Sequence, residues 1–297
     1  GTLYFRGRLN SIDGGGGVTN ENDYVAARVA PNGSLTVLAR EGLEVPGLPS
    51  HTLKGNPGES SPPPLYPRCN ADGQATFVHP ITEGGSDEYA VFHVDPAGNT
   101  TVAWRTGDTV PGLDGGEEFL AFAKSPLLNG SGQLTFRGVM QAGEGGAAVG
   151  GGLDTGLFGP GADGQTTLLM REGDAAPDSP QGVFENIHVH FDKTIAADGA
   201  VAFIHSFKYN NWYIEDGLWR HDPANPGVLT TEMVQGAAAA GLPEGWSFGS
   251  LVSLTGNAAG RLAVQGNVNF GEDEFGDPLQ SKEAVWVQTD AGVFELV

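Results

Sequence analysis

The chain has a single cysteine, Cys69, among its 297 residues, so no disulfide bond can form within it. Lysine and arginine are also scarce: there are 15 of them against 36 aspartates and glutamates, which gives a formal net charge of −21. Binding of nucleic acid needs a basic footprint, and an anionic membrane surface repels such a chain, so we expect neither partner. No apolar run approaches the roughly 20 residues of a membrane-spanning helix, so we expect no membrane insertion.

Glycine and proline, in contrast, are abundant. The 47 glycines and 19 prolines stand between short apolar runs, as turn residues do in a protein of many β-strands. Hydrophobic residues make up 39% of the chain, which suffices for a thin, repeated core and argues against disorder.

One phrase recurs along the chain. It reads G-QLTFRGVM from Gly132, and related phrases begin at Gly1, Gly73, Gly199 and Gly260. Most internal copies follow an Asn-x-x-Gly turn. Such self-similarity is the signature of a repeat architecture. The sequence therefore predicts one repeat domain over residues 1–297, with approximate units 1–72, 73–131, 132–198, 199–259 and 260–297.

Each predicted unit has the same order of elements. A strand follows the anchor glycine, then come an insertion rich in glycine and acidic residues, a two-stranded hairpin, the phrase R-x-G-D-x-x-P-G, and a fourth strand. The predicted hairpins cover residues 24–40, 89–105, 156–171, 217–234 and 284–297. Four short strands per unit predict an all-β fold, a five-bladed β-propeller or a solenoid, and the alternation within strands favours the propeller.

Asp108 and Asp174 close the R-x-G-D phrase in two units. Because a residue that recurs from unit to unit usually stabilises a turn, we expect a structural role for both carboxylates rather than a catalytic one.

The two ends of the chain complement each other. The chain stops where an R-x-G-D phrase would begin, and it opens on the strand that follows an anchor glycine. We therefore expect the last blade to be incomplete, or closed by the N-terminal strand of the same molecule. In the alternative, that strand pairs with a neighbouring subunit and builds a head-to-tail fibre. The predicted contact residues are Thr2, Leu3, Tyr4, Phe5, Arg6, Arg8 and Leu9.

The recurring N-x-x-G-x-x-[AT]-F phrase, with its R-x-G-D-x-x-P-G partner, resembles a family of bacterial secreted proteins. That family is described by tandem NxxGxxAF repeats and a choice of C-terminal cell-surface anchors. The resemblance implies export and an extracellular or cell-surface location, after removal of an N-terminal leader that this chain does not contain. It implies no catalytic residues, and the chain departs from the family pattern because no anchor follows Val297.

These observations favour an extracellular structural protein that assembles with copies of itself into a fibre or surface layer. Since the sequence contains no nucleophile elbow, no phosphate-binding loop and no distinguished pair of carboxylates, we expect no enzymatic activity. Two alternatives stay open: a monomeric secreted propeller that binds carbohydrate or protein through its loops, and a glycan-directed hydrolase.

Several residues are candidates for contact with glycans. Asn32, Asn99 and Asn129 stand in N-x-[ST] sequons within predicted turns, and these are candidate glycosylation sites. Trp212 and Tyr213 belong to an aromatic, amide-rich insertion that can stack on a sugar, although packing of the loop explains them equally.

Two sets of residues are candidates for a cation. Glu272, Asp273, Glu274 and Asp277 crowd one short insertion and are candidate ligands for structural calcium. His188 and His190 lie two residues apart on one strand face, a spacing that suits zinc but also an ordinary pair of surface histidines.

Overall fold

The structure is a computed structural model of the chain, and it describes most of the 297 residues. The described residues are 1–9, 18, 23–54, 67–123, 125–141, 155–179, 182–184, 192–209, 213–272 and 278–297. They form strands and turns, and none of them lies in a helix. In this part of the chain there is accordingly no helix long and apolar enough to cross a membrane. The prediction of an all-β fold is confirmed.

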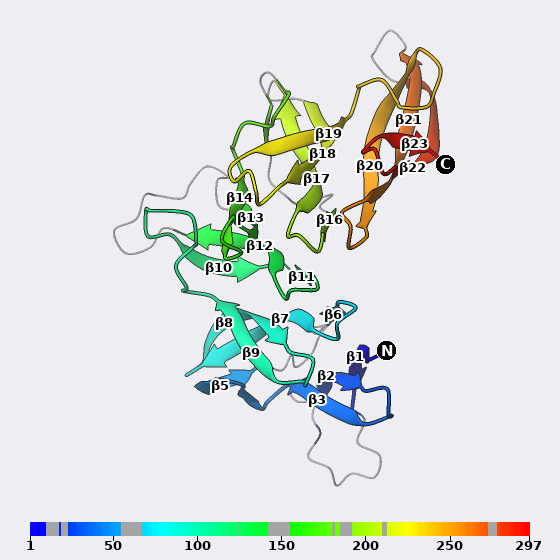
Figure 1. Ribbon diagram of the computed structural model, residues 1–297. Helices are drawn as coiled ribbons and strands as arrows, with labels where there is room; N and C mark the ends of the chain where they lie inside the picture. The colour runs from blue at the N-terminus through cyan, green and yellow to red at the C-terminus, as the bar shows by residue number, and fades with distance from the viewer. Residues whose placement is uncertain are drawn as a thin grey trace. The chain divides into compact units, whose positions relative to one another are not determined.

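The chain divides into two compact units, Gly1–Val149 and Gly150–Val297, and each is described by itself (Figure 1). The strands of the first unit are β1 (Leu3–Arg8), β2 (Tyr24–Val29), β3 (Leu35–Arg40), β4 (Glu44–Val45), β5 (Leu48–Leu53), β6 (Arg68–Cys69), β7 (Ala75–Glu83), β8 (Ser86–Val94), β9 (Thr100–Arg105), β10 (Glu118–Phe122), β11 (Leu127–Leu128) and β12 (Leu134–Gln141). Strands β1-β2-β3 form one sheet, β4-β5-β7-β8-β9 form a second with β6 beside β7, and β10 and β11 both pair with β12.

The second unit repeats this pattern. Its strands are β13 (Thr155–Pro160), β14 (Thr166–Arg171), β15 (Val183–Phe184), β16 (Asp192–Ile195), β17 (Val201–Tyr209), β18 (Tyr213–His221), β19 (Leu229–Val234), β20 (Trp246–Gly256), β21 (Leu262–Glu272), β22 (Pro278–Gln288) and β23 (Phe294–Leu296). Strands β13 and β14 form a hairpin, β15-β17-β18-β19 form a sheet with β16 beside β17, and β20-β21-β22-β23 form the last sheet.

The sheets are offset from the predicted sequence units. The strand that ends one unit pairs with the first strand of the next, as β5 does with β7, β15 with β17 and β20 with β21. The last sheet therefore contains all four of its strands, and β1 pairs with β2 in the first sheet (Figure 1). The prediction that the last blade is incomplete, or closed by the N-terminal strand, is wrong. Among the described residues, the first sheet has three strands, one fewer than the last sheet.

The Asn-x-x-Gly turn has a clear physical reason. In the turn before β7, the side-chain oxygen of Asn70 accepts hydrogen bonds from the backbone N–H groups of Asp72 and Gln74, at 3.1 and 2.9 Å. Asn129 and Asn257 accept the corresponding bond from the residue four positions on. The glycine takes a positive φ, 80° at position 132, which a residue with a Cβ rarely adopts. Asparagine and glycine together thus set the start of β7, β12 and β21.

The hairpins also match the prediction. Strands β2–β3, β8–β9, β13–β14 and β18–β19 form antiparallel pairs close to the predicted ranges. Each of these four pairs carries a register shift at the same relative place, as between Val91 and Phe92. A bulge of this kind increases the local twist of the strand that contains it.

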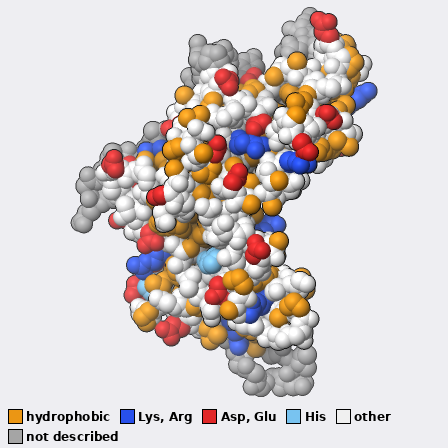
Figure 2. All heavy atoms as spheres, in the orientation of Figure 1, with side chains coloured by type: hydrophobic (Ala, Val, Ile, Leu, Met, Phe, Trp, Pro, Cys, Tyr) orange, Lys and Arg blue, Asp and Glu red, His pale blue; other side chains and the backbone are white. Residues whose placement is uncertain are grey.

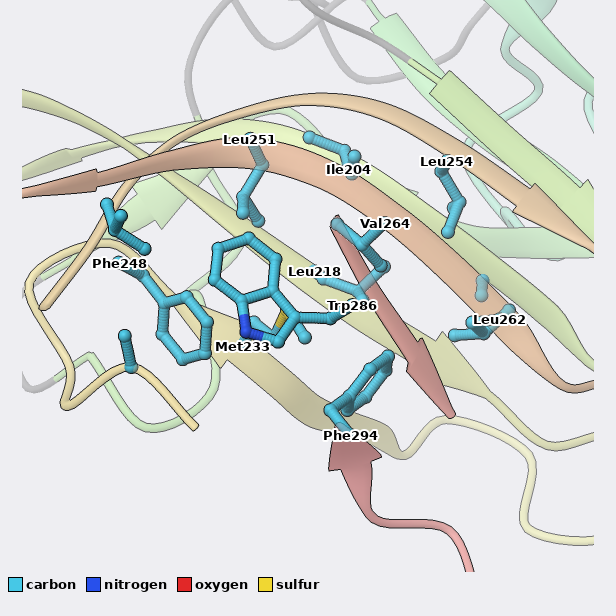
Figure 3. Packing of buried hydrophobic residues seen from close by; sticks show 13 residues of the cluster. Ile204, Leu218, Met233, Phe248, Leu251, Leu254, Leu262, Val264, Trp286 and Phe294 are labelled. Atoms are coloured by element: carbon cyan, nitrogen blue, oxygen red, sulfur yellow. The ribbon is translucent and has the colours of Figure 1, made fainter. Parts of the chain in front are cut away.

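Large apolar side chains on strands such as β7, β8, β20 and β22 form the cores. In the first unit, the rings of Phe77 and Phe92 stack with centroids 4.8 Å apart. In the second unit, one cluster lies between the two last sheets, with Trp286 against Phe248 at 4.9 Å (Figure 3). Each of these clusters combines residues from two sheets, so apolar contacts hold the sheets together, and hydrogen bonds hold the strands within each sheet.

Candidate metal centre

Strands β5, β7 and β8 bring three potential metal ligands to one face of the second sheet. His51 pairs with Glu83 across β5 and β7, and Glu88 pairs with Ile81 across β7 and β8. Cross-strand partners point to the same face, and so do residues two apart on one strand. His51, Glu83 and Glu88 consequently share the face that carries the buried Ile81.

The side chains are close enough to hold one ion. Nε2 of His51 lies 3.5 Å from Oε2 of Glu83 and 3.7 Å from Oε2 of Glu88. One ligand atom from each residue lies within 4.8 Å of the other two. A tetrahedral ion with bonds of about 2.0–2.1 Å has ligands about 3.4 Å apart, so the two histidine distances suit such an ion.

Burial makes the arrangement costly without a cation. The His51 side chain is only 5% exposed, and neither ring nitrogen has a hydrogen-bond partner. Oε2 of Glu88 also lacks one. Buried polar atoms are normally satisfied, because each unsatisfied one costs about 1–3 kcal/mol. A metal ion would satisfy Nε2 of His51 and Oε2 of both glutamates together.

The backbone next to His51 is strained. Ser50 has a φ of +82°, although it is not a glycine, and its hydroxyl donates a hydrogen bond of 2.8 Å to Oε1 of Glu83. A non-glycine residue in this region costs on the order of 1–3 kcal/mol, and such strain concentrates at ligand-binding sites. Ser50 therefore orients Glu83 from the outer shell of the site.

The donor set indicates the class of metal. Imidazole nitrogen with carboxylate oxygen suits zinc and other first-row transition ions, whereas calcium takes oxygen ligands in larger number. Another buried histidine of the same sheet, His79, lacks such a carboxylate pair. Its Nε2 contacts the backbone oxygen of Lys54 at 3.1 Å, and burial lowers its pKa to about 3, so it stays neutral.

Little in the sequence points to this site. Glu83 and Glu88 flank the Gly84–Gly85 turn of a hairpin, which was a usable signal. His51 lies 32 residues before Glu83 and on a different strand, β5. Only the pairing of β5 with β7 brings His51 to the carboxylates.

The predicted cation ligands lie elsewhere. His188, His190, Asp273, Glu274 and Asp277 are outside the described residues, and so is the side chain of Glu272, which ends β21. On the face that Figure 2 shows, acidic side chains are spread among uncharged ones instead of forming one patch. Calcium binding stays a prediction.

The predicted subunit contacts of β1 are largely used within the chain. Tyr4 is buried, and its hydroxyl donates a hydrogen bond of 2.5 Å to the backbone oxygen of Gly73. Nε of Arg8 donates to Asp23 at 2.6 Å. Because β1 pairs with β2 and its Tyr4 joins the core, this strand lies in the sheet of its own chain, and its contact with a neighbouring subunit stays a prediction.

The other residues predicted to contact a neighbouring subunit also lie in or beside the first sheet, and Arg6 and Leu9 have partners there. The guanidinium of Arg6 lies 4.0 Å from the centre of the Tyr24 ring, and the N–H of Leu9 donates to the backbone oxygen of Asp23. Phe5 faces the same side as Leu3, which is 62% exposed, and Thr2 precedes the strand.

The three candidate glycosylation sites differ in their exposure to solvent. Asn32 and Asn99 are exposed in hairpin turns, as a modification site requires. Asn129 is buried, and its amide is bonded to Gln133, so the prediction of a glycosylation site there is wrong. Trp212 and the side chain of Tyr213 lie outside the described residues.

The R-x-G-D phrase is structural, as expected. The carboxylates of Asp108 and Asp174 accept hydrogen bonds of 2.8 Å from the backbone N–H groups of Arg105 and Arg171. The residue before the glycine has a second role that the sequence analysis missed. Its side-chain oxygen accepts from the N–H at or near the start of the preceding hairpin, in the pairs Glu41 with Tyr24, Thr106 with Tyr89, Glu172 with Thr155 and Gln235 with Asp216.

A family profile matches the sequence. It is described as "Family of unknown function (DUF7453)", and it aligns with residues 1–226 and again with residues 66–297. Two overlapping alignments to one profile agree with a repeated sequence. None of the curated proteins matches the chain significantly.

Two solved structures are similar to the chain at low identity. One is an endo-1,4-beta-xylanase from Bacteroides thetaiotaomicron VPI-5482, with 11% identity and a TM-score of 0.31, over 100% of this chain and 90% of that one. The other is a mutant of the GH43 protein BlXynB from Bacillus licheniformis, with 10% identity and a TM-score of 0.27, over 94% of this chain and 51% of that one.

These matches bear on one expectation from the sequence. Their names contradict the expectation that the chain is not an enzyme, and we withdraw it. TM-scores of 0.31 and 0.27 assign no reaction, substrate or catalytic residue to this chain in its place.

Proposed function

This chain belongs to DUF7453, a family of unknown function, and from the geometry of its first unit we propose that it binds a divalent transition-metal ion, with zinc as the best fit. The ligands are Nε2 of His51 and Oε2 of Glu83 and Glu88. The observation that carries the proposal is the buried imidazole of His51, which has no hydrogen-bond partner and whose Nε2 faces two carboxylates at 3.5 and 3.7 Å.

Binding of the ion would also clamp the sheet. Only three residue pairs join β5 to β7, and His51 with Glu83 is one of them. An ion bound to β5, β7 and β8 together would tie this short strand to the long hairpin. A metal at 100 times its dissociation constant stabilises the folded state by about 2.7 kcal/mol.

The test is a zinc titration of the full chain by calorimetry, with metal analysis after desalting. We expect one zinc per chain. His51→Leu keeps an apolar side chain in the buried position, and Glu88→Gln removes one charge; each is expected to raise the dissociation constant at least about 100-fold, since loss of even an outer-shell partner costs 10–100-fold.

Asp87→Asn is the matched control. Asp87 is the neighbour of Glu88, but it points to the opposite face and pairs with Lys54. Its replacement should leave zinc affinity unchanged. Wild-type protein that retains no zinc, or His51→Leu protein that binds as tightly as the Asp87→Asn control, would contradict the proposal.

A second proposed function is self-association at the first sheet. Strands β7, β17 and β21 carry antiparallel partners on both edges, whereas β1 pairs only with β2 among the described strands. One face of the first sheet carries three exposed apolar side chains: Leu3 and Leu35, which are each 62% exposed, and Val37. An open strand edge beside exposed apolar side chains is a site where another chain can add a strand. We propose a second copy of this chain as that partner.

Sedimentation and electron microscopy test the second function. Deletion of residues 1–9 is a poor test, because Tyr4 belongs to the core. We expect wild-type protein to form larger species as its concentration rises and Leu3→Lys protein to stay monomeric, since a lysine blocks an edge. Leu43→Lys replaces another exposed leucine, which is 52% exposed in a turn, and should behave like wild type. Wild-type protein that is monomeric at every concentration would exclude this function.

The wider setting rests on the sequence. Export and a surface location follow from the repeat resemblance, and both stay predictions. The same holds for a five-bladed propeller and for glycan binding through the loops, whose aromatic candidates lie outside the described residues.

A further inference from the structure

The chain supplies three ligands to the proposed ion, and the number decides what else the ion can bind. Among the described residues, no fourth histidine, cysteine or acidic side chain joins His51, Glu83 and Glu88. Zinc sites that serve only structure are usually closed by four protein ligands, whereas sites with three keep a position for water or substrate.

Ser50 limits Glu83 to a single bond to the ion, so that the protein supplies three bonds in all. Its hydroxyl occupies Oε1 of Glu83 with a hydrogen bond of 2.8 Å, while Oε2 of the same carboxylate faces His51. Glu83 is therefore disposed to give the ion one oxygen instead of two. A second bond from this carboxylate would fill the position that a small ligand needs.

Solvent reaches the site from one side. The His51 side chain is 5% exposed, but the Glu83 side chain is 51% exposed. Two carboxylates and a neutral imidazole balance the charge of a divalent ion, so no strong field repels an incoming oxygen donor.

We propose, on the basis of the proposed metal centre, that the bound ion keeps coordination positions open for a small molecule that chelates through two oxygen atoms. Ser50 is the positioning residue that keeps these positions free. Such a ligand expands a four-coordinate ion to five, a change that zinc sites with three protein ligands accept.

Cobalt(II) makes this test visible, because its absorption spectrum depends on coordination number. The cobalt-loaded full chain is titrated with acetohydroxamate, and cobalt is measured after desalting. We expect a saturable spectral change with one acetohydroxamate per cobalt and no loss of metal. An unchanged spectrum with cobalt retained would overturn the inference and leave metal binding intact, and so would removal of cobalt by acetohydroxamate.

Failure of the proposed function looks different, since the protein would then retain no cobalt before any ligand is added. Ser50→Gly tests the positioning role: glycine accepts the φ of +82°, and loss of the hydroxyl frees Oε1 of Glu83. We expect at least about fivefold weaker acetohydroxamate binding in this variant, with cobalt still bound. Ser86→Ala, opposite Glu83 across β7 and β8, is the matched control and should respond as wild type. Equal responses of both variants would overturn the role of Ser50.

Discussion

Replacing Trp219 by alanine is expected to lower the free energy of unfolding of the second unit by about 3–5 kcal/mol, the usual cost of removing a large buried aromatic. Trp219 is fully buried on β18. Its ring lies 4.9 Å from Phe184 and 5.7 Å from Phe207, both edge to face. Gly217 makes room for it, because a Cβ there would lie 2.2 Å from the indole. Few neighbours can move to fill the cavity.

Trp219→Phe separates packing from polarity. Nε1 of Trp219 has no hydrogen-bond partner, so phenylalanine removes an unsatisfied N–H while it keeps most of the apolar contact. We expect a loss below about 1.5 kcal/mol. The matched change is Trp286→Phe, which deletes the bond from Nε1 to the backbone oxygen of Ala240 at 3.1 Å and should cost about 1 kcal/mol more.

Denaturant unfolding measures these three variants, with hydrogen exchange of peptides from β18 and β21 to assign the loss to the second unit. A Trp219→Ala protein that loses less than about 1 kcal/mol would show that the site collapses around the cavity, against the rigid packing that the structure shows.

Local features of the fold could be read from the sequence. Asn129 and Gly132 have one side-chain acceptor and one positive φ, and both properties belong to the residue types themselves. The carboxylate of Asp108 bonds three residues back, to the N–H of Arg105. Such contacts span a few residues, so a repeated pattern of letters is enough to predict them.

Pairing between distant strands could not be read in the same way. The repeat gave the order of strands but left open whether the fourth strand joins its own unit or the next one. The pairing of β5 with β7 joins the end of one unit to the start of the next, and the apolar contacts of Leu53 and Ile81 hold it. The metal centre depends on this pairing, because His51 is the only ligand that comes from β5.

The second large effect concerns Glu41, which stands before the glycine of the R-x-G-D phrase. The equivalent positions of other repeats make the same hydrogen bond with a different side chain. Glu41 is fully buried, and its Oε2 accepts a hydrogen bond of 3.3 Å from the N–H of Tyr24. Burial, together with the charge of Asp23, raises the pKa of Glu41 from 4.5 to about 7, against the opposing effects of the Tyr24 N–H and of Arg6 and Arg8. Gln235 makes the same bond in a later repeat without any charge.

We therefore expect Glu41→Gln to stabilise the first unit by up to roughly 3 kcal/mol above pH 7, at about 1.4 kcal/mol per pKa unit. The folded state holds more protons on Glu41 than the unfolded state between pH 4.5 and 7, so its contribution to stability falls as pH rises through this window. Below pH 4.5 Glu41 is protonated in both states, and glutamine, its isostere, should change little.

Unfolding of wild type and variant at pH 4.5 and pH 8, followed by hydrogen exchange in β2 and β3, gives the difference directly. Because the variant is compared with wild type at each pH, titration of other groups such as His79 cancels. Glu44→Gln changes an exposed carboxylate three residues away and should give the same small difference at both pH values. A gain for Glu41→Gln that is equal at both pH values would mean that the charge of Glu41 is not what destabilises this turn.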